Sequence, residues 1–226
     1  MKYGIVLVLT ACSGTVTTAE YDDVARSVAN SAAGDTAAML DVIAIAQGNP
    51  PAGFAPDDSG AIDGSRGALD FSYLVTCKDA GGSALAACGA DAATANVTYD
   101  WAGTIDLPAT ITREGQWTVT GLQGATATIE GDAEYVDDAT IDDTSYHFDA
   151  TATYTAVAID AATQLATNGA IALDIAATQS STTGDTAFSL TADVTLAAGS
   201  AAIVLDGTHD YTADLATGDV TSGESP

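Results

Sequence analysis

Apolar and polar residues alternate along most of the chain between residues 68 and 220. The first row of alternating apolar side chains begins with Leu69, Phe71 and Tyr73. A period of two is typical of antiparallel strands that bury one face and expose the other. Turn sequences such as Thr183-Gly184-Asp185 separate the rows, so strands that follow one another in sequence should pair in space. We therefore expect an antiparallel meander of about eight to ten strands, forming a flattened barrel, a half-barrel or a sandwich.

The segment before these strands has a helical pattern instead. Thr17 and Glu20 have the spacing of a capping box, and apolar residues then recur four positions apart. Gly34 can end this helix, and Asp35 can cap a second one. We expect two short helices within residues 17–48, available as a lid for the apolar face of the meander.

The remaining segments complete the expected organisation. Residues 49–67 are rich in proline and glycine and predict an irregular linker. The antiparallel β domain then occupies residues 68–220, and residues 221–226 form a tail. The inward rows contain much alanine, which fills a wide barrel poorly, and this favours a flattened barrel or a sheet with the helices against it.

The N-terminus has the pattern of a secretory signal. One lysine precedes the short apolar run Gly4–Leu9, and small residues follow it. A membrane span needs about 20 apolar residues, so this run is too short for one. Leu9-Thr10-Ala11-Cys12 resembles the lipobox of bacterial lipoproteins. The resemblance implies that residues 1–11 are a signal peptide, that Cys12 carries acyl chains such as palmitate, and that residues 12–16 tether the protein to a membrane.

The same resemblance implies a location. Ser13 after the lipidated cysteine is similar to the pattern of outer-membrane lipoproteins, which face the periplasm or the cell surface. Residues 205–218 resemble β-rich envelope lipoproteins without an assigned activity, so they imply no chemistry. The expected partner is the membrane, reached through the N-terminal lipid.

With Cys12 lipidated, Cys77 and Cys88 remain as an even pair in an oxidising compartment. We expect them to form a structural disulfide that closes a short loop. A redox or zinc site is disfavoured because the spacing is wrong and no further ligands lie nearby.

The composition excludes two classes of protein. The chain has 31 Asp and Glu against 5 Lys and Arg, a formal net charge of −26, while 47% of its residues are hydrophobic. Five cations cannot neutralise the phosphates of a nucleic acid, and a disordered acidic tail would not contain so many apolar residues. An acidic, lysine-poor surface is typical of adaptation to salt, which screens self-repulsion.

Calcium binding is the alternative explanation for the acidity. Asp57, Asp58 and Asp63 lie with glycines in one loop, and Asp137-Asp138 and Asp142-Asp143 bracket a second turn. Calcium takes oxygen ligands from such loops. Neither segment has the spacing of an EF-hand, so ordinary acidic turns are the preferred interpretation, and no other cofactor is indicated.

Catalytic motifs are absent from the sequence. The two histidines, His147 and His209, accompany neither a G-x-S-x-G nor an H-E-x-x-H sequence. Glu130 and Glu134 share a strand parity that places them on the wet face, which favours solvated carboxylates over a catalytic pair. We therefore expect no enzymatic activity.

Arg113 has two interpretations. It shares parity with Ile111, so a regular strand would turn it toward the apolar face, where it would anchor an anionic group. A bulge at Glu114-Gly115 would instead leave it at a wet rim, and we favour this bulge.

Three functions remain, in order of preference. The first is an outer-membrane-anchored acidic surface lipoprotein with a structural or interaction role. The second is a carrier for an apolar or acyl ligand, held in a cavity lined by Trp101 and Trp117 together with Phe71 and Tyr73. The third is an enzyme that acts on envelope polymers.

Overall fold

One helix and one antiparallel sheet make up the described part of the chain. The computed structural model describes residues 18–105, 109–141, 144–182 and 184–223. The helix is α1 (Thr18–Ala46). The twelve strands are β1 (Ala55–Pro56), β2 (Ile62–Arg66), β3 (Leu69–Lys78), β4 (Thr94–Ile105), β5 (Ala109–Thr120), β6 (Thr126–Ile141), β7 (Thr144–Asp160), β8 (Leu165–Ser181), β9 (Gly184–Ala197), β10 (Ser200–Leu205), β11 (His209–Asp214) and β12 (Val220–Ser222).

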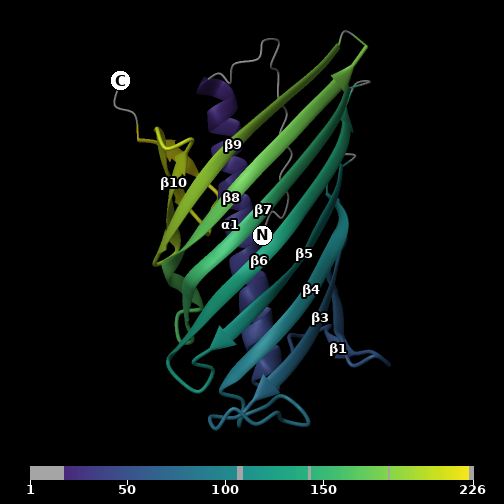
Figure 1. Ribbon diagram of the computed structural model, residues 1–226, viewed down its shortest axis with the longest axis vertical. Coiled ribbons are helices and arrows are strands. Elements are labelled where there is room, and N and C mark those ends of the chain that lie inside the picture. Colours follow the sequence, from purple (N-terminus) through teal and green to yellow (C-terminus); the bar gives the residue numbers. More distant parts are fainter. Residues whose placement is uncertain (1–17, 106–108, 142–143, 183, 224–226) are drawn as a thin grey trace.

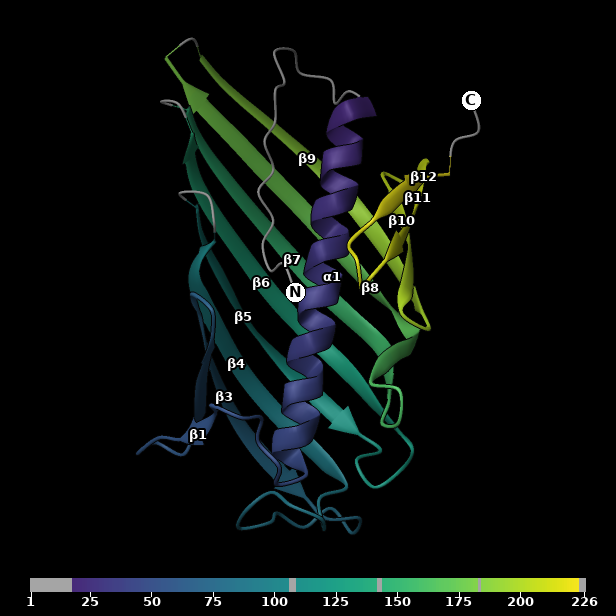
Figure 2. The ribbon, with the colours of Figure 1, turned by 180° about the vertical axis from the view of Figure 1, so that it is seen from behind.

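The strands form a single meander whose order in space is their order in sequence. The sheet curves around α1, and its edge strands β1 and β12 do not pair with each other, so it does not close (Figures 1 and 2). The prediction of an antiparallel meander is confirmed. Of the three predicted forms, the half-barrel is the nearest, because one open sheet is neither a closed barrel nor two packed sheets.

Shifts of register interrupt the longest strands, β6, β7 and β8. The register between β6 and β7 shifts at Gly131, and the register between β7 and β8 shifts near Ala156, which has a φ of 49°. Bulges of this kind bend a strand and increase its twist. Gly131 has a φ of 152°, and a Cβ atom there would lie 2.0 Å from the carbonyl oxygen of Gln116, so only glycine fits.

α1 covers the concave face of the sheet along the long axis of the molecule (Figure 2). Its 29 residues correspond to a length of about 43 Å. Its backbone approaches β3 on one side and β8, β10, β11 and β12 on the other. Among the described residues, α1 is the one helix, and it is too polar to qualify as a membrane-spanning segment.

The prediction of two short helices is wrong, because α1 continues through Gly34 and Asp35 without a break. Asp35 is buried, and its carboxylate accepts hydrogen bonds from two tyrosines of the sheet instead of capping a new helix. Gly34 is also buried, so tertiary packing compensates for its low helix propensity.

The strand count was also too low, and the linker was not irregular throughout. The segment 49–67 contains β1 and β2, and β2 pairs with β3 along its whole length. Phe54 covers Gly64 of β2, where a Cβ atom would lie 2.4 Å from the ring. Together with β12 at the other edge, these strands bring the total to twelve.

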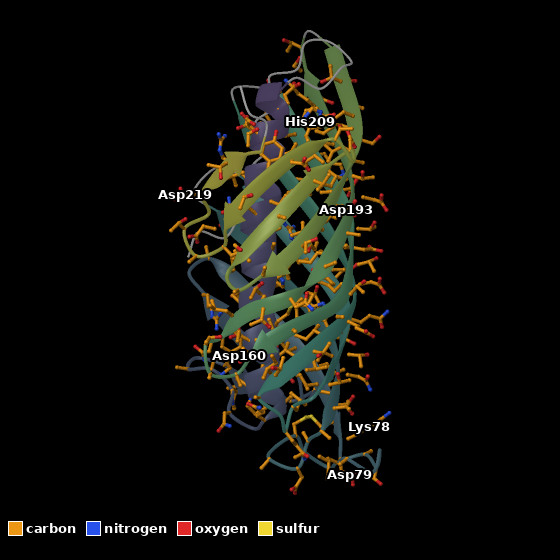
Figure 3. The ribbon with its side chains drawn as sticks, turned by 90° about the vertical axis from the view of Figure 1, so that its left-hand side faces the viewer. Lys78, Asp79, Asp160, Asp193, His209 and Asp219 are labelled. Atoms are coloured by element: carbon orange, nitrogen blue, oxygen red, sulfur yellow. A yellow bond between two sulfur atoms is a disulfide. The ribbon has the colours of Figure 1, made fainter. Side chains whose placement is uncertain are left out.

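The alternation of buried and exposed residues agrees with the sequence pattern. In β5, for example, Ile111, Trp117 and Val119 are buried, while Thr110, Gln116 and Thr118 are exposed. The disulfide between Cys77 and Cys88 is confirmed as well. It lies at the end of the molecule where α1 ends, next to Lys78 and Asp79 (Figure 3).

Candidate functional sites on the two faces of the sheet

A cluster of polar side chains is buried between α1 and the central strands. Asp35 of α1 accepts hydrogen bonds at Oδ2 from the hydroxyls of Tyr135 in β6 (2.5 Å) and Tyr154 in β7 (2.9 Å). The two hydroxyl oxygens are themselves 2.6 Å apart. Burial raises the pKa of Asp35 to about 6, against the opposing effects of both tyrosines and of Arg113.

Arg113 points into the same interior, so the predicted bulge at Glu114-Gly115 is wrong. β5 keeps its register with both neighbours over this stretch, and Arg113 is 2% exposed. Its guanidinium donates hydrogen bonds to both carboxylate oxygens of Asp137, and lies 4.4 Å from the ring centre of Tyr135. Burial would lower the pKa of Arg113, but the hydrogen bonds to Asp137 and its charge raise it, so the arginine stays charged.

The residues predicted to line a carrier cavity pack against one another instead. Phe71 stacks on Trp101 at 5.5 Å between ring centres, and Trp117 lies 4.0 Å from Tyr99. Each of these rings is at most 4% exposed, and Tyr73 is fully buried. The indole N–H groups of both tryptophans find no hydrogen-bond partner within the described part of the chain.

The outer face of the sheet carries two shallow grooves with volumes of about 580 and 450 Å³. Acidic side chains of β4 to β9 project from this face, away from α1, and Asp193 is one of them (Figure 3). The two grooves share Glu134. Both grooves are therefore open and lined by acidic residues rather than forming a deep apolar pocket.

One row of carboxylates crosses this face directly from strand to strand. Asp100 of β4 lies opposite Glu114 of β5, and Glu114 lies opposite Glu134 of β6. All three are exposed, and none forms an ion pair with a described basic residue. Burial and the nearby charge of Asp63 raise the pKa of Asp100. Like charges at directly opposed positions destabilise a sheet.

The candidate calcium ligands do not converge. Asp57 accepts hydrogen bonds from Ser59 and from the backbone N–H of Ala61, and the bonds from Ser59 lower its pKa most. Within the described ranges, no three His, Cys, Asp or Glu side chains are arranged to hold a metal ion. Asp58 and Asp63 are exposed, Asp137 pairs with Arg113, and Asp142 and Asp143 lie outside the described residues.

The two histidines lie in different surroundings. His147 on the outer face contacts Asp138 at 2.7 Å and Asp149 at 2.9 Å, and the hydrogen bond with Asp138 raises its pKa most. His209 stacks on Tyr21 of α1 with 3.8 Å between ring centres. Glu130 and Glu134 are exposed, as their parity predicted. Cys12 lies outside the described residues.

Comparisons with protein-family models, with curated proteins and with solved structures found no match.

Sequence reasoning missed the contact of Asp35 with Tyr135 and Tyr154. The period of two puts Tyr135 in one row with Ile129 and Tyr154 in one row with Phe148, and a buried tyrosine hydroxyl usually has a hydrogen-bond partner. This signal indicated that a polar group had to lie opposite the tyrosines. It did not indicate which residue, because Asp35 is 100 positions from Tyr135 in the chain.

Replacing Arg113 tests the buried ion pair. Arg113→Met leaves the charge of Asp137 buried without its partner, so we expect a loss of about 3–5 kcal/mol in the free energy of unfolding, measured in denaturant titrations. The double variant Arg113→Met, Asp137→Leu should recover most of this loss because it removes both charges. A single variant as stable as the wild type would contradict the pairing.

Replacing Glu114 tests the carboxylate row. Glu114→Gln removes one charge that faces a like charge on each side, so at low salt we expect a gain of about 0.5–1 kcal/mol in stability. The gain should vanish at about 1 M salt, where charges are screened within about 3 Å. Glu130→Gln is the matched control, since Glu130 lies opposite Thr118, and its effect should be smaller. Equal gains in both variants would show that only net charge matters.

Proposed function

We propose that this protein is an acidic surface lipoprotein, anchored in the outer membrane, with a structural or interaction role and no catalytic activity. The observation that carries the proposal is the filled concave face. α1 and the stacked aromatic rings occupy the space in which a half-barrel carrier would hold its ligand. What remains accessible is the broad, acidic outer face, a surface suited to contact rather than to enclosure.

The position of α1 fits an N-terminal anchor. Five residues lie between Cys12 and Thr18, where α1 begins, so the tether spans at most about 20 Å. The first turn of α1 lies at one end of the long axis, and the Cys77–Cys88 loop lies at the other (Figures 1 and 3). A lipid on Cys12 would hold the first end near the membrane and leave the outer face accessible.

The charge of the outer face indicates the class of interaction partner. A row of Asp and Glu that forms no ion pair with a described Lys or Arg attracts basic segments of envelope proteins or cations of the medium. The same charge disfavours nucleic acids, whose phosphates would be repelled.

The lipid anchor is tested by removing its attachment site. Cys12→Ser should abolish labelling by an alkyne analogue of palmitate in a Gram-negative host and move the protein out of the membrane fraction, because the thiol that accepts the diacylglyceryl group is gone. The matched control replaces Cys77 and Cys88 with serine and should keep both the label and the fractionation. An unlabelled wild-type protein would refute the anchor.

The absence of a carried ligand is tested by native mass spectrometry of residues 13–226, secreted to a periplasm and purified without added lipid. We expect the mass of the bare polypeptide, because the interior aromatic rings already pack on one another. An adduct with the mass of an acyl lipid, lost on denaturation, would instead favour the carrier.

A further inference from the structure

Three oxygen atoms in the buried cluster lie within hydrogen-bond distance of one another. They are Oδ2 of Asp35 and the hydroxyl oxygens of Tyr135 and Tyr154, at separations of 2.5, 2.9 and 2.6 Å. Each of the three contacts needs one proton between its oxygens. When Asp35 is ionised, the two hydroxyls supply only two protons for the three contacts. In one of the contacts, two oxygen atoms then face each other with no proton between them, and their lone pairs repel.

A proton on Asp35 supplies the missing hydrogen bond. Asp35 then donates to one tyrosine, that tyrosine donates to the other, and the second donates back to Asp35. Every contact in the ring holds one proton. The neutral carboxyl group also avoids the cost of burying a charge, since Asp35 is only 2% exposed.

We propose that Asp35, Tyr135 and Tyr154 form a proton-operated latch that holds α1 against the sheet, closed when Asp35 is protonated and loosened when it is ionised. The latch is a regulatory device of the fold. It does not depend on the anchor or on the proposed function.

The other groups around Asp35 do not supply the missing proton. Arg113 attracts the ionised form, but its guanidinium is bound to Asp137. The hydroxyl of Tyr99 is buried, and burial raises its pKa well above the ordinary value, so it stays neutral. The titratable or charged groups that interact with Asp35 are, by strand, Tyr99 (β4), Arg113 (β5), Tyr135 (β6) and Tyr154 (β7), and Asp137 (β6) binds Arg113.

The sign of the pH dependence follows from the raised pKa. Asp35 titrates at about 6 in the folded protein and at 3.8 when unfolded. Its stabilising contribution is therefore complete below pH 3.8 and is lost as the pH rises through 6. The latch works in the range in which a mildly acidic compartment differs from a neutral one.

The latch lies in the middle of α1, and polar contacts also hold the two ends. Near the start, Tyr21 donates a hydrogen bond to Asp206, and near the end, Asp41 pairs with Arg66. Exposed contacts of the first kind contribute little to stability. Loosening the middle of α1 would uncover the aromatic interior, so the pH would control how often the concave face opens.

Hydrogen exchange of the full-length protein, followed by mass spectrometry at pH 5.0 and 7.5 and corrected for intrinsic rates, tests the latch. We expect peptides from the middle of α1 to open about tenfold less often at pH 5.0, as a pKa of about 6 in the closed form requires. Asp35→Asn should remove most of this difference. Asp174→Asn removes one exposed carboxylate of the outer face and should keep the difference in full.

Three results would overturn the latch: no pH dependence of α1 in the wild type, the same dependence in Asp35→Asn, or its loss in Asp174→Asn. If Asp35→Asn does not fold, a carbon-detected NMR titration of the wild-type carboxyl groups decides. A carboxyl that titrates near 6 and belongs to Asp35 supports the latch. An Asp35 that titrates at about 4, the ordinary value, refutes it.

Discussion

An open sheet with an apolar concave face cannot exist in water unless something covers that face, and here the cover is α1. The helix backbone lies near β3 and near β8 and β10–β12, while the central strands are further away. The side chains match this asymmetry. The buried aliphatic residue Ile203 lies on β10, where the helix is close, and Tyr135 on the more distant β6 reaches Asp35 of α1 through its hydroxyl. Bulges at Gly131 and near Ala156 provide the curvature.

The helix must also be held in one position on the concave face. The inner surface of the helix is mostly alanine and valine, which bury area but define position weakly. Directional contacts therefore fix the position of the helix along the sheet. Asp35 forms hydrogen bonds with two tyrosine hydroxyls on adjacent strands, and Asp41 forms an ion pair with Arg66 of β2. Asp35 is buried at the contact that positions the helix, and burying its charge is unfavourable. The stability of the folded protein therefore depends on whether Asp35 is protonated.

The sheet could be predicted from the regular alternation of apolar and polar residues. The contacts between residues far apart in the sequence could not be predicted. The inward parity of Phe71, Trp101 and Trp117 followed from the period of two, and so did the exposure of Glu134. Gly34-Asp35 resembled a helix boundary because local sequence signals cannot show that Asp35 will form hydrogen bonds with two tyrosines of the sheet. Arg113 had the correct parity in the sequence. The preference for a bulge failed because its partner, Asp137, lies on the next strand, 24 residues away.

The positions of the basic residues differ between the concave face and the outer face of the sheet. Among the described residues, Arg113 serves the interior, Arg66 and Arg26 pair with acids of α1, and Lys78 lies at the end of the molecule. None of the arginine ion pairs in the described part of the chain involves the row of Asp100, Glu114 and Glu134. Two buried acids, Asp41 and Asp137, each have an arginine partner, so Arg66 and Arg113 offset the cost of burying charge rather than the repulsion on the outer face. Ions of the medium screen the repulsion between those exposed carboxylates, and they affect the buried ion pairs much less.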